Sequence, residues 1–145
     1  MTLYTIGFTK KTAERFFVML RQSGAERVVD VRRNNVSQLA GFAKRDDLQF
    51  FLRELCDMDY VHMPLLAPEQ PILDRYKKEG SSWAEYERAF LEQLTADHVE
   101  TEVDSALLDN ACLLCSEDQP DHCHRRLVAE YLQRHWDKLT IKHLT

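Results

Sequence analysis

Reactive and charged side chains gather in one short stretch near the C-terminal end of the chain. An apolar run, Ala111-Cys112-Leu113-Leu114, leads into Cys115-Ser116-Glu117, and a polar loop then precedes Asp121-His122-Cys123-His124-Arg125-Arg126. Thiol, imidazole, carboxylate and guanidinium groups serve as nucleophiles, acid–base groups and anion ligands in enzymes. This stretch is therefore the first candidate for a chemical site.

Two cysteines in this stretch, Cys115 and Cys123, could act as nucleophiles. A thiol in the first turn of a helix beside an arginine has a lowered pKa, and the thiolate is its reactive form. If Asp121 is the N-cap of the following helix, Cys123 lies in the first turn of that helix near Arg125 and is the expected thiolate. Alternatively, His124 could act as a general base for Cys115 across the loop. Burial as small apolar side chains is the non-reactive alternative for both cysteines.

The cysteine spacing also raises the questions of a metal site and of a disulfide. Zinc sites need ligands that converge on one point, and the spacing Cys112-x2-Cys115-x7-Cys123-His124 superficially fits one. Residues three apart in a strand point to opposite faces, so Cys112 and Cys115 cannot both bind one ion. We therefore expect no metal and no other cofactor. A regulatory disulfide between Cys115 and Cys123 is sterically conceivable, and Cys56 is expected to be structural.

A second group of charged residues follows an earlier apolar run. Asp30 and Arg32 are two residues apart and would share one face at the end of a strand. Asp30 could orient a base or a water while Arg32 binds an oxyanion, because the guanidinium fork suits carboxylate and phosphate. An ion pair that shapes the next loop is the alternative. Lys44 could fold over the same site, and Tyr60 and Glu117 could bind the ligand or orient the histidine.

Apolar runs typical of strands alternate with helical patterns along the chain. Strands are predicted at 3–7, 27–32, 60–63, 112–115 and 139–144. Helices are predicted at 11–23, from Asp46 as N-cap, at 83–94 and at 121–135, with a loop and a helical turn over 66–82. This order predicts a single-domain α/β layer fold over residues 1–145. Its sheet should be mostly parallel, with about five strands flanked by helices.

The predicted fold brings the candidate residues together. In open α/β sheets, ligands bind beyond the carboxyl ends of the strands, where helix N-termini also favour anions. The candidates at these ends include Gly7, Thr9, Asp30, Arg32, Cys115 and Glu117. In the last long helix, the apolar stripe extends back to His124, which should face the strand ends. Cys123 and Arg125 should lie at the edges of the site, and Arg126 should point into solvent.

Several sequence blocks, spread over almost the whole chain, fit one pattern. They are Tyr4-Thr5-Ile6-Gly7, Asp30-Val31-Arg32, Phe42-Ala43-Lys44 with Leu48, Tyr60, and Leu114-Cys115-Ser116-Glu117 with Cys123-His124-Arg125. This pattern resembles the domain-of-unknown-function 488 family, and its last block is the most specific. The resemblance implies a Rossmann-like α/β fold, and the paired cysteines of the family suggest an enzymatic role without an established activity. This chain departs from the family at Phe8-Thr9 and Leu65-Leu66-Ala67-Pro68, where polar residues and Leu-Gly-Gly are common.

Composition narrows the range of partners. The chain has 145 residues, a net charge of -5 and 44% hydrophobic residues. These values favour a globular protein and disfavour general binding to nucleic acid or to anionic membrane. The sequence has no run long and apolar enough to span a bilayer and no signal peptide, so we expect a cytoplasmic protein with reduced cysteines.

The sequence predicts an enzyme that acts on a small anionic compound, phosphorylated or nucleotide-like. Arg32 and Arg125 would clamp the anion, His124 would act as acid or base, and a cysteine would be the nucleophile or redox group. One alternative is a nucleic-acid-associated module with a basic patch made of Arg32, Arg33, Lys44, Arg45, Arg125 and Arg126. The other is a non-catalytic ligand-binding or interaction domain. The aromatic residues at 83, 86 and 90 are expected in the core, and the oligomeric state is open.

Overall fold

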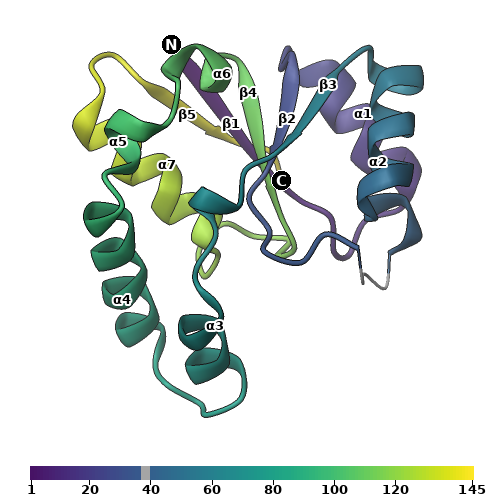
Figure 1. The fold of residues 1–145 in the computed structure, drawn as a ribbon. Coiled ribbons are helices and arrows are strands. Elements are labelled where there is room, and N and C mark those ends of the chain that lie inside the picture. Colours follow the sequence, from purple (N-terminus) through teal and green to yellow (C-terminus); the bar gives the residue numbers. More distant parts are fainter. Residues whose placement is uncertain (37–39) are drawn as a thin grey trace.

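One parallel sheet organises the chain (Figure 1). The computed structural model describes residues 1–36 and 40–145, so residues 37–39 of the predicted loop after the second strand lie outside the described residues. The strands are β1 (Thr2–Gly7), β2 (Arg27–Asp30), β3 (Asp59–His62), β4 (Ala111–Cys115) and β5 (Thr140–His143). They pair in the order β3-β2-β4-β1-β5, and all pairs are parallel. The predicted α/β class is confirmed, and the sheet is entirely rather than mostly parallel.

Helices cover both faces of the sheet. One face carries α1 (Ala13–Ser23), α2 (Arg45–Phe51) and the π-helical turn Leu52–Cys56 that continues α2. The other carries α3 (Gln70–Lys77), α4 (Trp83–Ala96), α5 (Val99–Glu102), α6 (Ser105–Leu108) and α7 (His124–His135). The chain reverses its direction across the sheet after β3, and right-handed crossovers then place later helices on the opposite face. Helix α3 and the start of α4 extend beyond the carboxyl edge of the sheet (Figure 1).

Local sequence signals explain several helix ends. The Thr12 hydroxyl caps the start of α1, and the helix stops at Gly24, whose φ of 92° is left-handed. The Ser82 hydroxyl caps α4 in the same way. The prediction of Asp46 as the N-cap of α2 is wrong, because Lys44 takes that position without a side-chain hydrogen bond. Asp46 lies in the first turn, where its charge still complements the helix dipole.

The main differences from the predicted elements lie near the carboxyl edge. The segment 66–82 contains the eight-residue helix α3 instead of only a loop with a helical turn. Pro71 stands in the first turn of α3, where a missing N–H costs no hydrogen bond. Helix α7 begins at His124 rather than at Asp121, because Cys123 has an extended backbone (φ -134°, ψ 139°) and is the N-cap.

The described residues form two hydrophobic clusters, one on each side of the sheet. Because strand residues alternate between faces, Cys112 and Leu114 join the cluster under α1 and α2, whereas Leu113 and Cys115 join the cluster under α4 and α7. Tyr86 and Phe90 are buried in the second cluster, as expected, and Trp83 is only partly buried at its edge. Among the described helices, none has the length and apolar character needed to cross a membrane.

Candidate functional site

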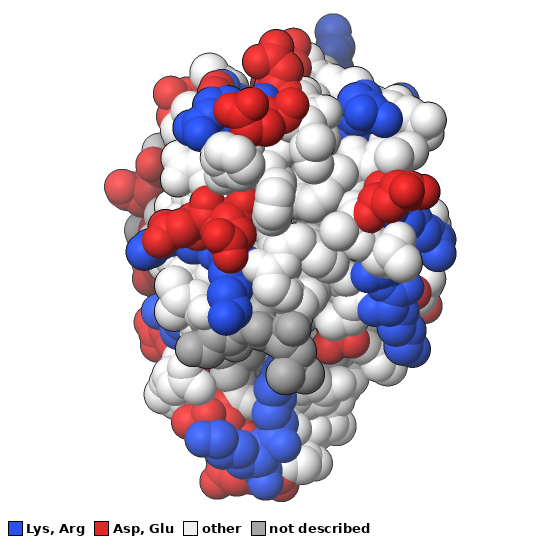
Figure 2. Space-filling view, turned by 90° about the vertical axis from the view of Figure 1, so that its right-hand side faces the viewer, with Lys and Arg blue, Asp and Glu red and all other residues white. Residues whose placement is uncertain are grey.

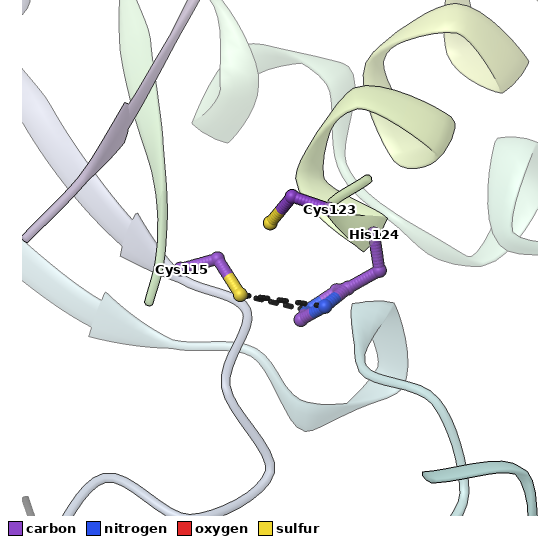
Figure 3. Close-up of side chains that lie close together, drawn as sticks. All are labelled: Cys115, Cys123 and His124. Atoms are coloured by element: carbon purple, nitrogen blue, oxygen red, sulfur yellow. Dashed lines mark hydrogen bonds between the residues drawn. The ribbon is translucent and has the colours of Figure 1, made fainter. Parts of the chain in front are cut away.

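Cys115, Cys123 and His124 meet where β4 ends and α7 begins (Figure 3). The Sγ atom of Cys115 lies 3.4 Å from Nδ1 of His124 and 3.7 Å from its Nε2. The sulfur atoms of the two cysteines and the nearest ring nitrogen all lie within 4.8 Å of one another. The three residues are only 6%, 2% and 7% exposed, so this cluster is almost completely removed from water.

A backbone contact fixes the tautomer of His124. Its Nε2 lies 2.6 Å from the carbonyl oxygen of Val31, which can only accept a hydrogen bond, so Nε2 carries the proton. In the neutral ring, Nδ1 is then an acceptor beside the sulfur of Cys115. Burial lowers the pKa of His124 and favours this neutral form. A histidine held in this way can take the proton of the neighbouring thiol.

The two thiols of the cluster differ in proton affinity. Burial raises the pKa of Cys115, but hydrogen bonds from Cys123 and from the backbone of Ser116, together with the charge of Arg125, hold that pKa below its usual value. The hydrogen bond to Cys115 and burial raise the pKa of Cys123. The predicted place of Cys123 in the first helical turn is wrong, because this residue is the buried N-cap of α7. The opposite directions of the two pKa shifts favour Cys115 as the thiolate of the pair.

Arg125 stabilises the loop between β4 and α7 from the inside. Its side chain is fully buried, and its guanidinium donates hydrogen bonds to the hydroxyl of Thr5 and to the carbonyl oxygens of Glu117 and Asp118. Arg125 contacts the backbone carbonyl of Glu117 and not its carboxylate, and Glu117 is exposed. Arg125 thus holds the backbone rather than an open anion site, contrary to its predicted role in an anion clamp.

The end of β1 touches the same loop at very short range. A Cβ atom at Gly7 would lie 1.6 Å from the carbonyl oxygen of Glu117, so only glycine lets the two segments pass. Two residues later, the backbone N–H and the hydroxyl of Thr9 both donate to the carbonyl oxygen of Ser116. Gly7 and Thr9 therefore position the loop that carries the site.

The substitution Gly7→Ala is expected to lower the free energy of unfolding by about 1–3 kcal/mol, the usual cost of forcing atoms into a packed interior. Gly41→Ala is the matched control, because a Cβ at Gly41 meets no atom within 4 Å. Urea denaturation of the two variants measures the difference. Equal stability of both variants would mean that the loop moves freely away from β1.

Asp30 and Arg32 form a buried ion pair on the side of the sheet that carries α1 and α2. Each oxygen of Asp30 accepts two hydrogen bonds: Oδ1 from the backbone N–H and Nε of Arg32, and Oδ2 from Nη2 of Arg32 and the hydroxyl of Tyr60. Nη2 of Arg32 also donates to the carbonyl of Ala43. The ion pair that shapes the loop is thus the arrangement found, and Asp30 has no oxygen left to orient a base.

Tyr60 belongs to this ion pair and not to the histidine. Its hydroxyl donates to Asp30 at 2.6 Å and accepts a hydrogen bond from the side chain of Asn35 at 3.0 Å. Burial and the neighbouring carboxylate raise the pKa of Tyr60, so its hydroxyl remains protonated. Among the described residues, Nη1 of Arg32 is buried without a hydrogen-bond partner, and it is the one donor of this network that is not used.

A pocket of about 360 Å³ opens over Cys115, Cys123 and His124. Its walls come from α3, from the start of α4 and from the loops after β2 and β4. The other lining residues are Arg32, Arg33, Asn34, Gln70, Leu73, Asp74, Tyr76, Lys77, Lys78, Trp83, Tyr86, Ser116, Glu117 and His122. Lys44 is exposed at the N-cap of α2 and does not line this pocket.

Comparison with known families decides what the chain is. Residues 12–132 match the family model described as domain of unknown function DUF488. The chain belongs to the DUF488 family. The resemblance of the sequence blocks is thereby confirmed, and the matched range includes all three residues of the cysteine and histidine cluster. Comparison with curated proteins and with solved structures found no significant match.

The pocket of this DUF488 protein carries more basic than acidic side chains. Arg33, Lys77 and Lys78 line it beside Arg32, whereas its acids are Asp74 and the exposed Glu117. Lys78 lies 3.5 Å from the carboxylate of Asp74, and Arg33 donates to two backbone carbonyls. Sequence reasoning missed the lysines because it did not place a helix at α3.

Aromatic rings form one wall of the pocket. The ring of His122 stacks on Trp83 at 4.9 Å with an interplanar angle of 19°, and Trp83 in turn stacks on Tyr86 at 4.9 Å. Tyr76, which lies on α3, packs against the rings of both Trp83 and Tyr86. Trp83 and Tyr86, expected only as core residues, thus also border the site.

The basic patch predicted for nucleic acid does not form one surface. Arg32 and Arg125 are buried, while Arg45 and Arg126 each form ion pairs with acidic neighbours. Figure 2 shows the side that carries α1 and α2, where Lys and Arg side chains alternate with Asp and Glu. Arg126 is therefore paired with acidic side chains at the surface. Its predicted direction had implied a side chain surrounded only by solvent.

Metal coordination is a second chemical possibility for the cluster. Cys115, Cys123 and His124 each offer one ligand atom to the space between them. Cys112, in contrast, lies in the cluster on the other side of the sheet, so it cannot join them. The argument from strand geometry thus holds for Cys112, but it leaves the other three residues as a possible ligand set.

Proposed function

We propose that this DUF488 protein is an enzyme that acts on a small anionic compound through the thiol of Cys115. The observation that carries the proposal is the distance of 3.4 Å between Cys115 Sγ and His124 Nδ1 at the floor of the basic pocket. The other ring nitrogen donates to Val31, so Nδ1 is the acceptor that a base requires. Nucleophile, base and orienting group are then all present.

The proposed step is a nucleophilic displacement. The proton of the Cys115 thiol passes to Nδ1 of His124, and the sulfur forms a bond to an electrophilic atom of the substrate. The bond from that atom to its leaving group breaks, and the leaving group departs with the electron pair and receives the proton from Nδ1. The carbonyl oxygen of Val31 keeps the ring in place and stabilises the positive charge that it carries between these transfers.

The lining of the pocket supports an anionic substrate. Lys77 and Lys78 project from α3 on one side, and Arg32 and Arg33 follow β2 on the other. Basic side chains in a partly enclosed pocket raise the local concentration of anions. In this proposal Arg33, Lys77 and Lys78 take the place of Arg125 beside Arg32, and the aromatic wall suits a nucleotide-like compound.

Two alkylating reagents that differ in charge test this proposal without knowledge of the substrate. Iodoacetate should modify Cys115 faster, relative to neutral iodoacetamide, than it modifies Cys56 in the same protein, because the pocket attracts the anion. The ratio should fall in high salt, which screens charge. It should also fall in the double variant Lys77→Ala/Lys78→Ala but not in Arg53→Ala, which removes an exposed arginine on the π-helical turn. Peptide mass mapping measures each site separately.

Equal reagent ratios at Cys115 and Cys56 would remove the anion-binding part of the proposal. A Cys115 that resists both reagents in the native protein would remove its nucleophilic part. Inorganic phosphate and pyrophosphate serve as competing anions in the same assay, and slower modification of Cys115 in their presence is the expected result.

A further inference from the structure

We propose that Cys115, Cys123 and His124 bind one divalent ion of the zinc class and leave a fourth coordination position open to the pocket. The inference goes beyond the proposed function, because an ion at this position would occupy the thiol that the function requires. Thiolate and imidazole are the ligands that zinc and cobalt select over harder cations. The site would therefore be a point at which such an ion blocks the chemistry of Cys115.

The spacing of the three ligand atoms fits an ion. In a tetrahedral zinc site the bonds to sulfur and nitrogen are about 2.3 Å and 2.0 Å, which places these two ligand atoms roughly 3.5 Å apart. The sulfur of Cys115 lies 3.4 Å from Nδ1 of His124, and all three ligand atoms lie within 4.8 Å of one another. Figure 3 shows the three side chains converging from the end of β4 and the start of α7. Only small side-chain adjustments are needed to enclose an ion.

The surroundings of His124 match those of a metal ligand. Histidines that bind metals usually donate the proton of the other ring nitrogen to a carbonyl or carboxylate, which fixes the ring and its tautomer. Here Nε2 donates to the carbonyl of Val31 at 2.6 Å. The ring of Phe90 packs edge-on against the imidazole of His124 and holds it from the side. Because Nε2 carries the proton, Nδ1 is left without one, and the sulfur of Cys115 lies 3.4 Å from it.

The fourth position distinguishes this site from a closed structural one. Cys112 belongs to the opposite side of the sheet, and the three ligands all line the same pocket. An ion bound by them would thus meet the pocket on its remaining side, where water or an anion could complete the tetrahedron. Sites with three protein ligands and one exchangeable position are typical of accessible zinc, whereas structural zinc has four protein ligands.

Cobalt spectroscopy tests the site directly. Reduced protein freed of metal with a chelator is titrated with Co²⁺, and a thiolate-to-cobalt charge-transfer band with tetrahedral visible bands should saturate at one equivalent. Zn²⁺ should remove these bands, because it binds such ligands more tightly than Co²⁺ does, whereas excess Mg²⁺ should not. The bands should be lost in Cys123→Ala and in His124→Ala and kept in Cys112→Ala and Cys56→Ala.

A second measurement uses the unaltered protein and does not depend on how the variants fold. Zn²⁺ should protect Cys115 and Cys123 from iodoacetamide while Cys56 continues to react. Absence of the charge-transfer band in the unaltered protein, or its survival in Cys123→Ala, would overturn the site. Either result leaves the proposed function untouched, because the reagent ratio at Cys115 is measured in the absence of metal.

Discussion

The substitution Asp30→Ala is expected to lower the free energy of unfolding by about 3–5 kcal/mol, the usual cost of removing one partner from a buried ion pair. Asp30 is fully buried and Arg32 is 3% exposed, so the guanidinium cannot turn to water when its carboxylate is lost. The hydroxyl of Tyr60 would lose its acceptor at the same time. Guanidinium chloride denaturation, followed by circular dichroism, measures the change.

Two further variants separate the ion pair from other causes of instability. The double variant Asp30→Ala/Arg32→Leu should be more stable than Asp30→Ala alone, because it leaves no buried charge without a partner. Asp46→Ala removes the acid of the exposed pair with Arg45 and should change stability little. If Asp30→Ala unfolds at the same denaturant concentration as Asp46→Ala, the buried pair does not hold the loop after β2.

The three central strands, β2, β4 and β1, were predictable because each one is a short, mostly buried run whose two faces are both covered. In β4 every residue is buried, so its sequence has a continuous apolar pattern that few other structures produce. Helix α3 was hidden by Pro68, Pro71 and Gly80, which suggest a loop when they are read as helix breakers. Pro71 in fact lies in the first turn of α3, while the other two lie outside the helix. Ile72, Leu73 and Tyr76, spaced for one helix face, were the available signal.

The position of the site followed from strand order, whereas the roles of its arginines did not. Arg32 and Arg125 were expected to bind a ligand because guanidinium groups commonly do so. Both make hydrogen bonds to groups of the protein, and most of those groups are backbone carbonyls, which every residue carries. Arg32, unlike Arg125, also lines the pocket. No sequence pattern shows which carbonyl will face which arginine. The placement of Cys123 in the first helical turn was wrong for a related reason, because it depended on where α7 begins.

The two uses suggested for the cysteine and histidine cluster make opposite demands on Cys115. Thiol chemistry requires a sulfur that is free to attack, whereas a bound ion holds that sulfur as a ligand. The buried position of Cys123 beside Cys115 serves both arrangements, since Cys123 donates a hydrogen bond to its neighbour in one and coordinates the ion in the other. The metal content of the protein therefore decides which of the two states is present.

Exchange of His124 for glutamine is expected to slow the modification of Cys115 by iodoacetamide on the order of 10²-fold at neutral pH, the lower end of the usual contribution of a positioned base. Glutamine keeps an N–H that can reach the carbonyl of Val31, but it has no basic atom to take the thiol proton. The neutral reagent is used because it responds little to the charges of Lys77 and Lys78.

His122→Gln is the matched control for this experiment. His122 lines the same pocket and is the nearest other histidine in the sequence, but it is exposed and stacks on Trp83. Its exchange removes an imidazole without touching the contact between Cys115 and His124, so the rate at Cys115 should stay within about twofold, well inside the effect of a positioned base. Equal rates in His124→Gln and His122→Gln would show that the contact of 3.4 Å packs the thiol without activating it. Loss of rate in the first variant alone would place the acceptor of the Cys115 proton at Nδ1 of His124, because this is the ring nitrogen that Val31 leaves free.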